Sequence, residues 1–380
     1  MNGRELFEAI YSGKHPDRLP LRGIGRWAET LERWHSEGLA PKADPNEVLG
    51  LVSDDVLSLP LNLNMVPPFT VQVLDLGANY VTLVDEYGVT KRMLRADYDR
   101  SQGLKGNAGM TSSMALWLDF PVRDLRTWKA IYEQRFQPTL AGRLPVDWEE
   151  QRAGFVQRSQ TRWVAHFCFP FGGLFSALRE LIGWPGLAYA LADDPKLVHT
   201  MVADLAEFYI NAFAQVLPDV CLDQITFFED MCATKAPLIG PATFREFIAP
   251  GYRKLVGELR ALGVRHFFVD SDGNVTPLVP ELLACGITGL VPCEVNAGMD
   301  VAKLRSAFPM LCLNGGIDKR ALADGPRAIK AELERCFTVA WNQGRYTPAL
   351  DHSAPPDISW ANVQYYARRF CHWCVAPQGR

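Results

Sequence analysis

From about residue 160 onward, the sequence alternates between short apolar segments and longer amphipathic ones. The short segments have strand length, whereas the longer ones carry apolar residues at helical spacing. The expected strands are 163–168, 224–228, 266–269, 289–291, 310–313 and 346–350. The expected helices are 175–182, 195–216, 241–262, 275–285, 301–308, 326–342 and 360–370. Such alternation predicts an α/β protein whose parallel strands are joined by helical crossovers.

The segments before residue 160 complete this picture. A strand at 19–23 brings the expected number to seven or eight, which favours a (β/α)8 TIM barrel over an open sheet. Helices at 3–11 and 27–37 predict an N-terminal helical extension. Residues 66–118 contain β-rich stretches followed by a polar, Gly- and Ser-rich stretch from residue 94. We therefore expect one domain over residues 1–380, with a small antiparallel β-meander and a loop inserted at 66–118.

The composition excludes several kinds of partner. The chain has 380 residues, 48% hydrophobic and 22% charged, which is typical of a globular protein. Its net charge of −4 gives no general attraction to nucleic acid or to an anionic membrane. No apolar run approaches the about 20 residues of a membrane span, and residues 1–5 lack a signal-peptide core. We expect a cytoplasmic monomer or homodimer that acts on a small molecule and keeps its nine cysteines reduced.

Acidic and polar side chains follow several of the expected strands. They are Glu229 and Asp230, Asp270 and Asp272, Glu294, and Asp351 and His352. A parallel barrel brings these strand ends together on one face. Acids at the mouths of buried strands are costly unless they pair, bind a metal or take part in chemistry. The pattern therefore predicts a functional site on that face.

Asp270 and Asp272 are the most prominent of these acids. They lie two positions apart, so in an extended segment both side chains point to the same side. Together with Asn274 they could hold a cation. The alternative is structural: Asp272 would cap the helix that follows, and Asp270 would pair with an arginine.

Four motifs carry a resemblance to a known family. They are Pro237-Leu238-Ile239-Gly240-Pro241, Asp270-Ser271-Asp272-Gly273-Asn274, Asn314-Gly315-Gly316-Ile317-Asp318-Lys319 and Asp351-His352-Ser353-Ala354-Pro355-Pro356-Asp357. On these motifs the chain resembles the uroporphyrinogen decarboxylase superfamily, and within it the corrinoid-dependent methyltransferases more than the decarboxylase itself. The resemblance covers 160–370 well and 1–60 loosely. It implies a (β/α)8 barrel.

The resemblance also implies a metal centre. The methyltransferases typically bind zinc through His-x-Cys-Gly after the fifth strand and a Cys near the eighth. Here the first two positions are Asp270 and Asp272, and the third falls near His352. These residues, with Glu294 or Glu229, would hold zinc or another divalent metal, since carboxylate and imidazole ligands also suit harder cations. Cobalamin would be carried by a separate corrinoid protein, because the chain lacks Asp-x-His-x-x-Gly.

Other candidates follow from position and residue type. The residues expected in catalysis are Glu229, Asp230 and Arg26, and those expected to bind substrate are Arg22, Trp27, His166 and Asn314. The two arginines lie near the strand where the decarboxylase holds carboxylates. Structural interpretations remain open: Glu229 could pair with Lys235 or Arg245, and Asn314 could belong to a tight turn. His166 and Trp27 could be core residues.

The leading hypothesis is a methyltransferase that works with a separate corrinoid protein and demethylates a methoxylated or methylated small molecule. A metal at the barrel mouth would act as a Lewis acid. The alternative is a metal-independent decarboxylase of a small or tetrapyrrole carboxylic acid, in which Arg22 or Arg26 holds the carboxylate. A barrel that only binds a ligand is the third possibility.

Overall fold

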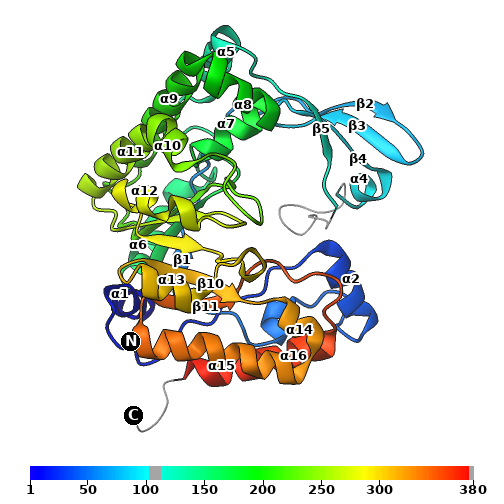
Figure 1. Ribbon diagram of the computed structural model, residues 1–380, viewed down its shortest axis with the longest axis vertical. Coiled ribbons are helices and arrows are strands. Elements are labelled where there is room, and N and C mark those ends of the chain that lie inside the picture. Colours follow the sequence, from blue (N-terminus) through cyan, green and yellow to red (C-terminus); the bar gives the residue numbers. More distant parts are fainter. Residues whose placement is uncertain (102–112, 376–380) are drawn as a thin grey trace.

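A curled parallel sheet forms the centre of the protein (Figure 1). The computed structural model describes residues 1–101 and 113–375. The strands of the sheet, in spatial order, are β1 (Val56–Ser58), β6 (Trp163–Cys168), β7 (Gln224–Phe228), β8 (His266–Asp270), β9 (Gly289–Val291), β10 (Cys312–Ile317) and β11 (Tyr346–Leu350). Every neighbouring pair is parallel. The expected parallel α/β order is therefore present, but the strands form a curled, open sheet of seven instead of the closed barrel of eight that was expected.

The missing eighth strand explains why the sheet does not close. Residues 19–23, predicted as the first strand, have no strand structure. They border a pocket together with Val56 of β1 and Leu350 of β11, the two edges of the sheet. Pro20 has no N–H group to donate and Gly23 has no side chain to pack, so this segment is poorly suited to ladder pairing.

Helices connect and cover the strands (Figure 1). They are α6 (Trp148–Ser159), α7 (Phe175–Ile182), α8 (Trp184–Asp193), α9 (Pro195–Ala214), α10 (Pro241–Thr243), α11 (Ala249–Ala261), α12 (Val279–Ala284), α13 (Val301–Ala307), α14 (Arg320–Asp324), α15 (Pro326–Gln343) and α16 (Trp360–Cys374). The helix expected over 241–262 is interrupted by a π-helical turn at Phe244–Ile248. The strand expected over 310–313 begins later and extends through both glycines that follow it.

The N-terminal segment forms α1 (Gly3–Ser12), α2 (Ala28–Ser36) and α3 (Pro45–Val48). Asn2 and Glu5 form a capping box that fixes the start of α1. From α1, Phe7 and Tyr11 place their rings 5.5 and 5.6 Å from the ring of Trp163, at the start of β6. These rings close the barrel at the N-terminal ends of its strands, so access is left from the opposite end.

The inserted segment forms a separate antiparallel sheet. Its strands, in order, are β2 (Gln72–Leu76), β3 (Tyr80–Val84), β4 (Thr90–Leu94) and β5 (Leu116–Asp119). The stretch 94–118, expected to be a loop, instead contains α4 (Arg95–Ser101) and most of β5, and its part 102–112 lies outside the described residues. A further helix, α5 (Leu125–Arg135), returns the chain to the barrel.

No helix among residues 1–101 and 113–375 is both long and apolar enough to cross a membrane.

Candidate active site

A cavity of about 290 Å³ lies inside the barrel. It extends from the aromatic plug at Trp163 to Asp270, the last residue of β8. Its other polar lining residues are Arg22, Ser58, His166, Gln224, Thr226 and Asn314. The volume is at the small end of the range for ligand pockets, which suits a small organic molecule.

Asp270 borders this cavity without a protein partner. No described residue makes a hydrogen bond or ion pair with its carboxyl group. Burial and, after it, the negative charge of Asp272 raise the pKa of Asp270 to about 8, and His352 opposes the shift. The carboxyl group is therefore largely protonated at neutral pH, so it can donate a proton into the cavity.

Asp272 and His352 form an ion pair beside Asp270. The His352 Nε2 lies 3.2 Å from an Asp272 carboxylate oxygen, and this contact raises the pKa of the imidazole. The Trp27 ring lies 5.6 Å from the His352 ring. Gly273 holds a left-handed φ of 76°, where a Cβ atom would lie 2.5 Å from the Ala233 carbonyl oxygen. Only glycine fits this turn, which brings the end of β8 against the loop after β7.

Salt bridges hold the other acids in place. Arg179 lies 2.9 Å from Asp230, whose pKa is nevertheless raised by burial. Glu294 accepts a hydrogen bond from the Gly273 N–H at 3.0 Å and lies 3.7 Å from the Lys319 ammonium group. The first contact ties the loop after β7 to α7, and the other two connect the loops after β8, β9 and β10.

Asp351 is the buried centre of this network. Its carboxylate accepts hydrogen bonds from the N–H groups of Val295 and Lys319, both at 3.0 Å, and lies 3.5 Å from the Lys319 ammonium group. The sequence places Asp351 beside His352 but gives no sign of this bridging role. Lys319 was also missed, although it ends one of the motifs that carry the resemblance.

Arg22 is the cation of the cavity. Among the described residues it has no ion pair and no hydrogen bond, and its removal from bulk water lowers the pKa of the guanidinium group. Arg22 is half-buried, and a guanidinium group withdrawn from water without a carboxylate is costly, so the position is suited to an anionic group of a ligand. Arg26, by contrast, pairs with Asp44 at 3.4 Å and does not border the cavity.

Two predicted substrate ligands, Asn314 and His166, both line the cavity but differ in their other contacts. Asn314 lines the cavity from β10, as expected of a substrate-binding residue. His166 receives or donates a hydrogen bond at Nδ1 with the Leu59 carbonyl group at 2.9 Å and packs edge-on against Phe213 of α9. Burial lowers the pKa of His166 to about 4, so it is neutral. These contacts favour the core interpretation of His166.

Glu229 anchors a helix. Its carboxylate accepts hydrogen bonds from the N–H groups of Leu174, Phe175 and Ser176 at 2.6–2.9 Å, and from the Tyr252 hydroxyl group at 2.6 Å. These donors surround the start of α7, and the side chain is fully buried. The expected salt bridge with Lys235 or Arg245 is not formed. Glu229 thus binds the positive end of a helix dipole, which favours a structural role.

Aromatic rings border the mouth near β6. Phe167 and Phe169 are stacked at 6.0 Å with an interplanar angle of 14°, and they are 50% and 43% exposed. Phe228, at the end of β7, meets Phe169 edge-on at 4.9 Å. This feature could not be predicted from the sequence, because an aromatic residue in a strand usually belongs to the core. The exposed rings offer an apolar surface to a flat ligand.

The predicted metal ligands lie at one mouth but do not form a preformed metal centre. In the part of the chain that the structure describes, no three His, Cys, Asp or Glu side chains are gathered so that they could hold a metal ion. His352 and Asp272 bind each other. The arrangement does not fit a metal as it stands, and metal binding stays a prediction.

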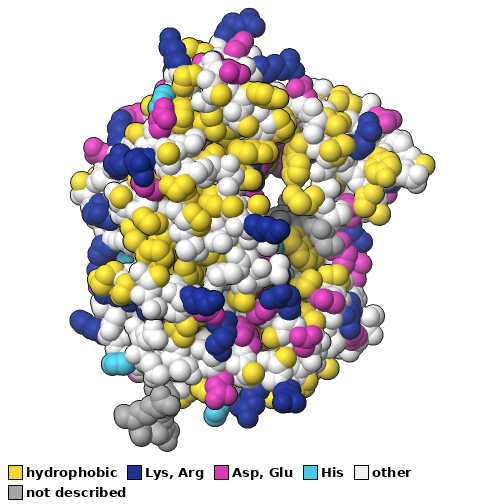
Figure 2. Space-filling model, in the orientation of Figure 1, with side chains coloured by type: hydrophobic (Ala, Val, Ile, Leu, Met, Phe, Trp, Pro, Cys, Tyr) yellow, Lys and Arg dark blue, Asp and Glu magenta, His cyan; other side chains and the backbone are white. Residues whose placement is uncertain are grey.

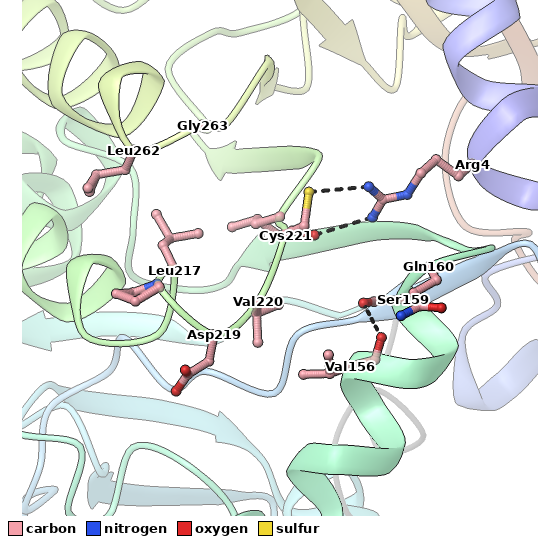
Figure 3. Close-up of a pocket in the computed structure, with 12 residues that line it drawn as sticks. Arg4, Val156, Ser159, Gln160, Leu217, Asp219, Val220, Cys221, Leu262 and Gly263 are labelled. Carbon is pink, nitrogen blue, oxygen red and sulfur yellow. Dashed lines mark hydrogen bonds between the residues drawn. The ribbon is translucent and has the colours of Figure 1, made fainter.

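A second pocket, of about 440 Å³, lies at the opposite end of the barrel (Figure 3). There the Arg4 guanidinium group donates to the Cys221 Sγ at 3.2 Å and to its carbonyl oxygen at 3.5 Å, and it pairs with Asp223 at 3.0 Å. The pocket is lined by residues that precede β6, β7 and β8. Active sites of this fold lie at the other strand ends, so we assign the site to the cavity that contains Asp270.

Comparison with known proteins decides the family. The family model of uroporphyrinogen decarboxylase (URO-D) matches residues 172–370, which is more than half of the chain. The chain belongs to the uroporphyrinogen decarboxylase family. This match contains the helix-anchoring Glu229, the acids at the mouth and the glycine turns around them. No curated protein matches the sequence.

A solved structure shares the fold over the whole length. It is a methyltransferase from Methanosarcina mazei, with a TM-score of 0.56 and 16% sequence identity, and the likeness covers 98% of this chain and 99% of that one. At this identity the likeness shows a common fold. The family match and the fold together indicate an enzyme of the uroporphyrinogen decarboxylase family.

Proposed function

We propose that this protein is a methyltransferase that demethylates a small methoxylated carboxylic acid and passes the methyl group to a corrinoid carried by a separate protein. The observation that carries the proposal is that Arg22 and Asp270 both line one cavity. One supplies an unpaired cation and the other a largely protonated acid. The full-length likeness to a methyltransferase supports the same reaction class.

Arg22 would bind the carboxylate of the substrate. A guanidinium group matches a carboxylate through two parallel hydrogen bonds, which fix the orientation of the acid as well as its position. Phe167 would lie against the body of the substrate, because its exposed ring borders the same cavity. This arrangement turns the methoxy group away from Arg22 and toward the strand ends.

Asp270 would act as the general acid. When the methyl–oxygen bond breaks, the oxygen keeps the bonding electron pair and takes the proton of Asp270. The reduced corrinoid of the partner supplies the nucleophile that accepts the methyl group. His352, which is paired with Asp272, lies near Asp270 and would return the proton from solvent.

The test uses purified protein, reduced cobalamin as acceptor and the methoxybenzoates as probes. We expect the corresponding hydroxybenzoate, measured by mass spectrometry, and much less product from methoxybenzene, which has no carboxylate for Arg22. Failure to form a demethylated product from any methoxylated acid, with reduced acceptor present and the protein folded, would contradict the proposal.

Decarboxylation is the second candidate, and the same Arg22 favours it. In that reaction the substrate would lose CO₂, and Asp270 would protonate the carbon left behind. The cavity of about 290 Å³ suits a small acid better than a tetrapyrrole. Release of CO₂ without methyl transfer would favour this second reaction.

A further inference from the structure

The open seam between β1 and β11 contains a cavity of about 450 Å³, which we call the seam pocket. It is lined mainly by residues 20–23, 51–53, 55–56, 314–315 and 349–350. Its volume lies within the range of ligand pockets in proteins. The chemistry of Asp270 takes place in the smaller cavity inside the barrel and leaves this larger space without a role.

The seam pocket and the inner cavity share a wall. Four residues line both of them: Arg22, Val56, Val291 and Asn314. A ligand group bound by Arg22 therefore lies at the boundary between the two spaces. Asp270 lines the inner cavity and not the seam pocket, so the reacting methoxy group belongs on the inner side of that boundary.

Polar groups at the shared wall lack protein partners. Asn314 is 6% exposed, and its side-chain amide makes no hydrogen bond with a described residue. The backbone N–H and C=O groups of Leu21, Arg22 and Gly23 likewise have no partner in the described part of the chain. Polar groups withdrawn from water are normally paired, so this boundary is suited to a polar group of a ligand.

The remainder of the seam pocket offers apolar side chains. Its polar residues are already engaged, since Asp55 accepts a hydrogen bond from Arg18 at 2.8 Å and Asn46 accepts one from the Ile24 N–H group at 2.8 Å. The side chains left to contact a ligand beyond the shared wall include those of Leu51, Val52 and Leu350. An apolar group can therefore be buried there with a gain in free energy.

The outer surface gives no preference for an acid. On the face drawn in Figure 2, Lys and Arg side chains are interspersed with Asp and Glu, and the net charge of the chain is −4. Such a surface creates no field of positive sign that would attract an anion. Selection of the substrate is therefore left to the side chains that line the two cavities.

We propose that the seam pocket is a second subsite of the active site, which receives an apolar substituent of the substrate. The subsite rests on the proposed function, in which Arg22 holds the carboxylate. The substrate class is then a methoxylated acid whose carboxylate lies between two apolar groups, one beside Phe167 and the other beside Leu350. The Asn314 amide would donate a second hydrogen bond to the carboxylate.

Isothermal titration calorimetry with two unreactive acids tests the subsite. Phenylacetate and diphenylacetate share a carboxylate, differ by one ring and carry no methoxy group. We expect the wild type to bind diphenylacetate about 10- to 100-fold more tightly, because the seam pocket buries the second ring. Val52→Trp and Ala349→Leu narrow the seam pocket from positions that do not line the inner cavity. Both should abolish this preference and leave the affinity for phenylacetate unchanged.

The matched control is Val48→Trp. Val48 is 55% exposed and lines neither cavity, so this variant should keep the wild-type preference for diphenylacetate. Circular dichroism establishes that each variant is folded. Equal affinities of the wild type for the two acids, or a preference that survives in both narrowed variants, would overturn the subsite and leave the role of Arg22 in place.

Arg22→Gln separates a failure of the subsite from a failure of the proposed function. Loss of the guanidinium group should weaken the binding of both acids, because both present their carboxylate to it. Unchanged affinities in Arg22→Gln would show that the carboxylate is bound elsewhere. That result would overturn the subsite together with the proposed function, since both depend on Arg22.

Discussion

Arg22 and Asp270 share one cavity, and neither side chain has a hydrogen bond or ion pair with a described residue. In a protein interior such groups usually satisfy each other or a neighbour. An acid kept neutral and a cation kept unpaired are each unfavourable for stability, so their presence in one cavity is best explained by a ligand that uses both. Three predictions follow from these two side chains.

Asp270→Asn removes the proton donor while it preserves size and shape. We expect kcat for demethylation to fall by about 10²- to 10⁴-fold. In the wild type the rate should fall as the pH rises through about 8, because Asp270 then loses its proton, and this dependence should vanish in the variant. Asp357→Asn, an exposed acid in the loop after β11, is the matched control. Equal rates and pH profiles for Asp270→Asn and wild type would exclude the role of general acid.

Asp270→Asn should also be more stable than the wild type at high pH. The pKa of Asp270 is about 8 in the folded state, above the about 3.9 of an unfolded chain. Below pH 4 the carboxyl group of Asp270 is protonated in both the folded and the unfolded wild type, so the variant is no more stable than the wild type. Between pH 4 and 8 only the unfolded state loses its proton, so the free energy of unfolding of the wild type decreases.

Urea denaturation at several pH values measures this difference. The advantage of Asp270→Asn should grow from near zero at pH 4 to on the order of 3 kcal/mol at pH 8, since the partial exposure of Asp270 reduces the full penalty of burial. An advantage that is constant with pH would show that the acid titrates normally in the folded protein.

Arg22→Gln should weaken substrate binding more than chemistry. Loss of a charged hydrogen-bonding partner for a carboxylate predicts a KM about 30- to 100-fold higher for methoxybenzoates. Arg22→Lys keeps the charge but loses the two parallel hydrogen bonds of the guanidinium group. Its KM should therefore lie between the values of the wild type and Arg22→Gln. Steady-state kinetics with methoxybenzene provide the comparison, since its low activity should be insensitive to both changes. An unchanged KM for the acids would place the carboxylate elsewhere.

At the scale of the elements, the strands of the main sheet were the easiest part to predict. The alternation of apolar segments was enough to predict β6–β9 and β11 closely, because their apolar runs have few competing interpretations. The prediction of a strand at 19–23 was wrong, because Pro20 and Gly23 oppose pairing with a neighbouring strand even in an apolar segment. Strands β2, β3 and β4 of the insertion were confirmed, but α4 and β5 were not predicted because the sequence from residue 94 is polar and rich in Gly and Ser.

Glu229 shows why strand-end acids cannot all be interpreted alike from sequence. Its position after β7 resembles that of Asp270 after β8, yet its carboxylate faces the start of α7 and accepts three backbone hydrogen bonds. Only the packing of the helix against the strand distinguishes the two. Local spacing does not contain that information.

Glu229→Ala should therefore reduce stability more than it affects the chemical step. The three N–H groups and the Tyr252 hydroxyl group would lose a buried acceptor, which predicts a decrease of about 3 kcal/mol or more in the free energy of unfolding. Urea denaturation measures it, with Asp230→Asn as the comparison. A stable Glu229→Ala protein with a collapsed kcat would restore the catalytic role that its position suggested.

At the scale of the molecule, the barrel brings the loops after β7, β8, β9, β10 and β11 to one mouth and leaves a small cavity beneath it. The family and the barrel architecture could be predicted from the motifs and the alternation. The meeting of Arg22, from the N-terminal segment, with Asp270, nearly 250 residues later, could not, because it depends on where the unclosed edge of the sheet lies. The metal centre and the corrinoid partner remain predictions.

Carbon tracing tests the central claim, demethylation by the Arg22–Asp270 cavity, most directly. Methoxybenzoate labelled with ¹³C in the methoxy group, or in a second sample in the carboxyl group, is incubated with the protein and reduced cobalamin and followed by NMR. We predict that the methyl label moves to the corrinoid fraction while the carboxyl label stays in the hydroxybenzoate. Release of the carboxyl label as ¹³CO₂, with the methyl label still on the product, would contradict methyl transfer.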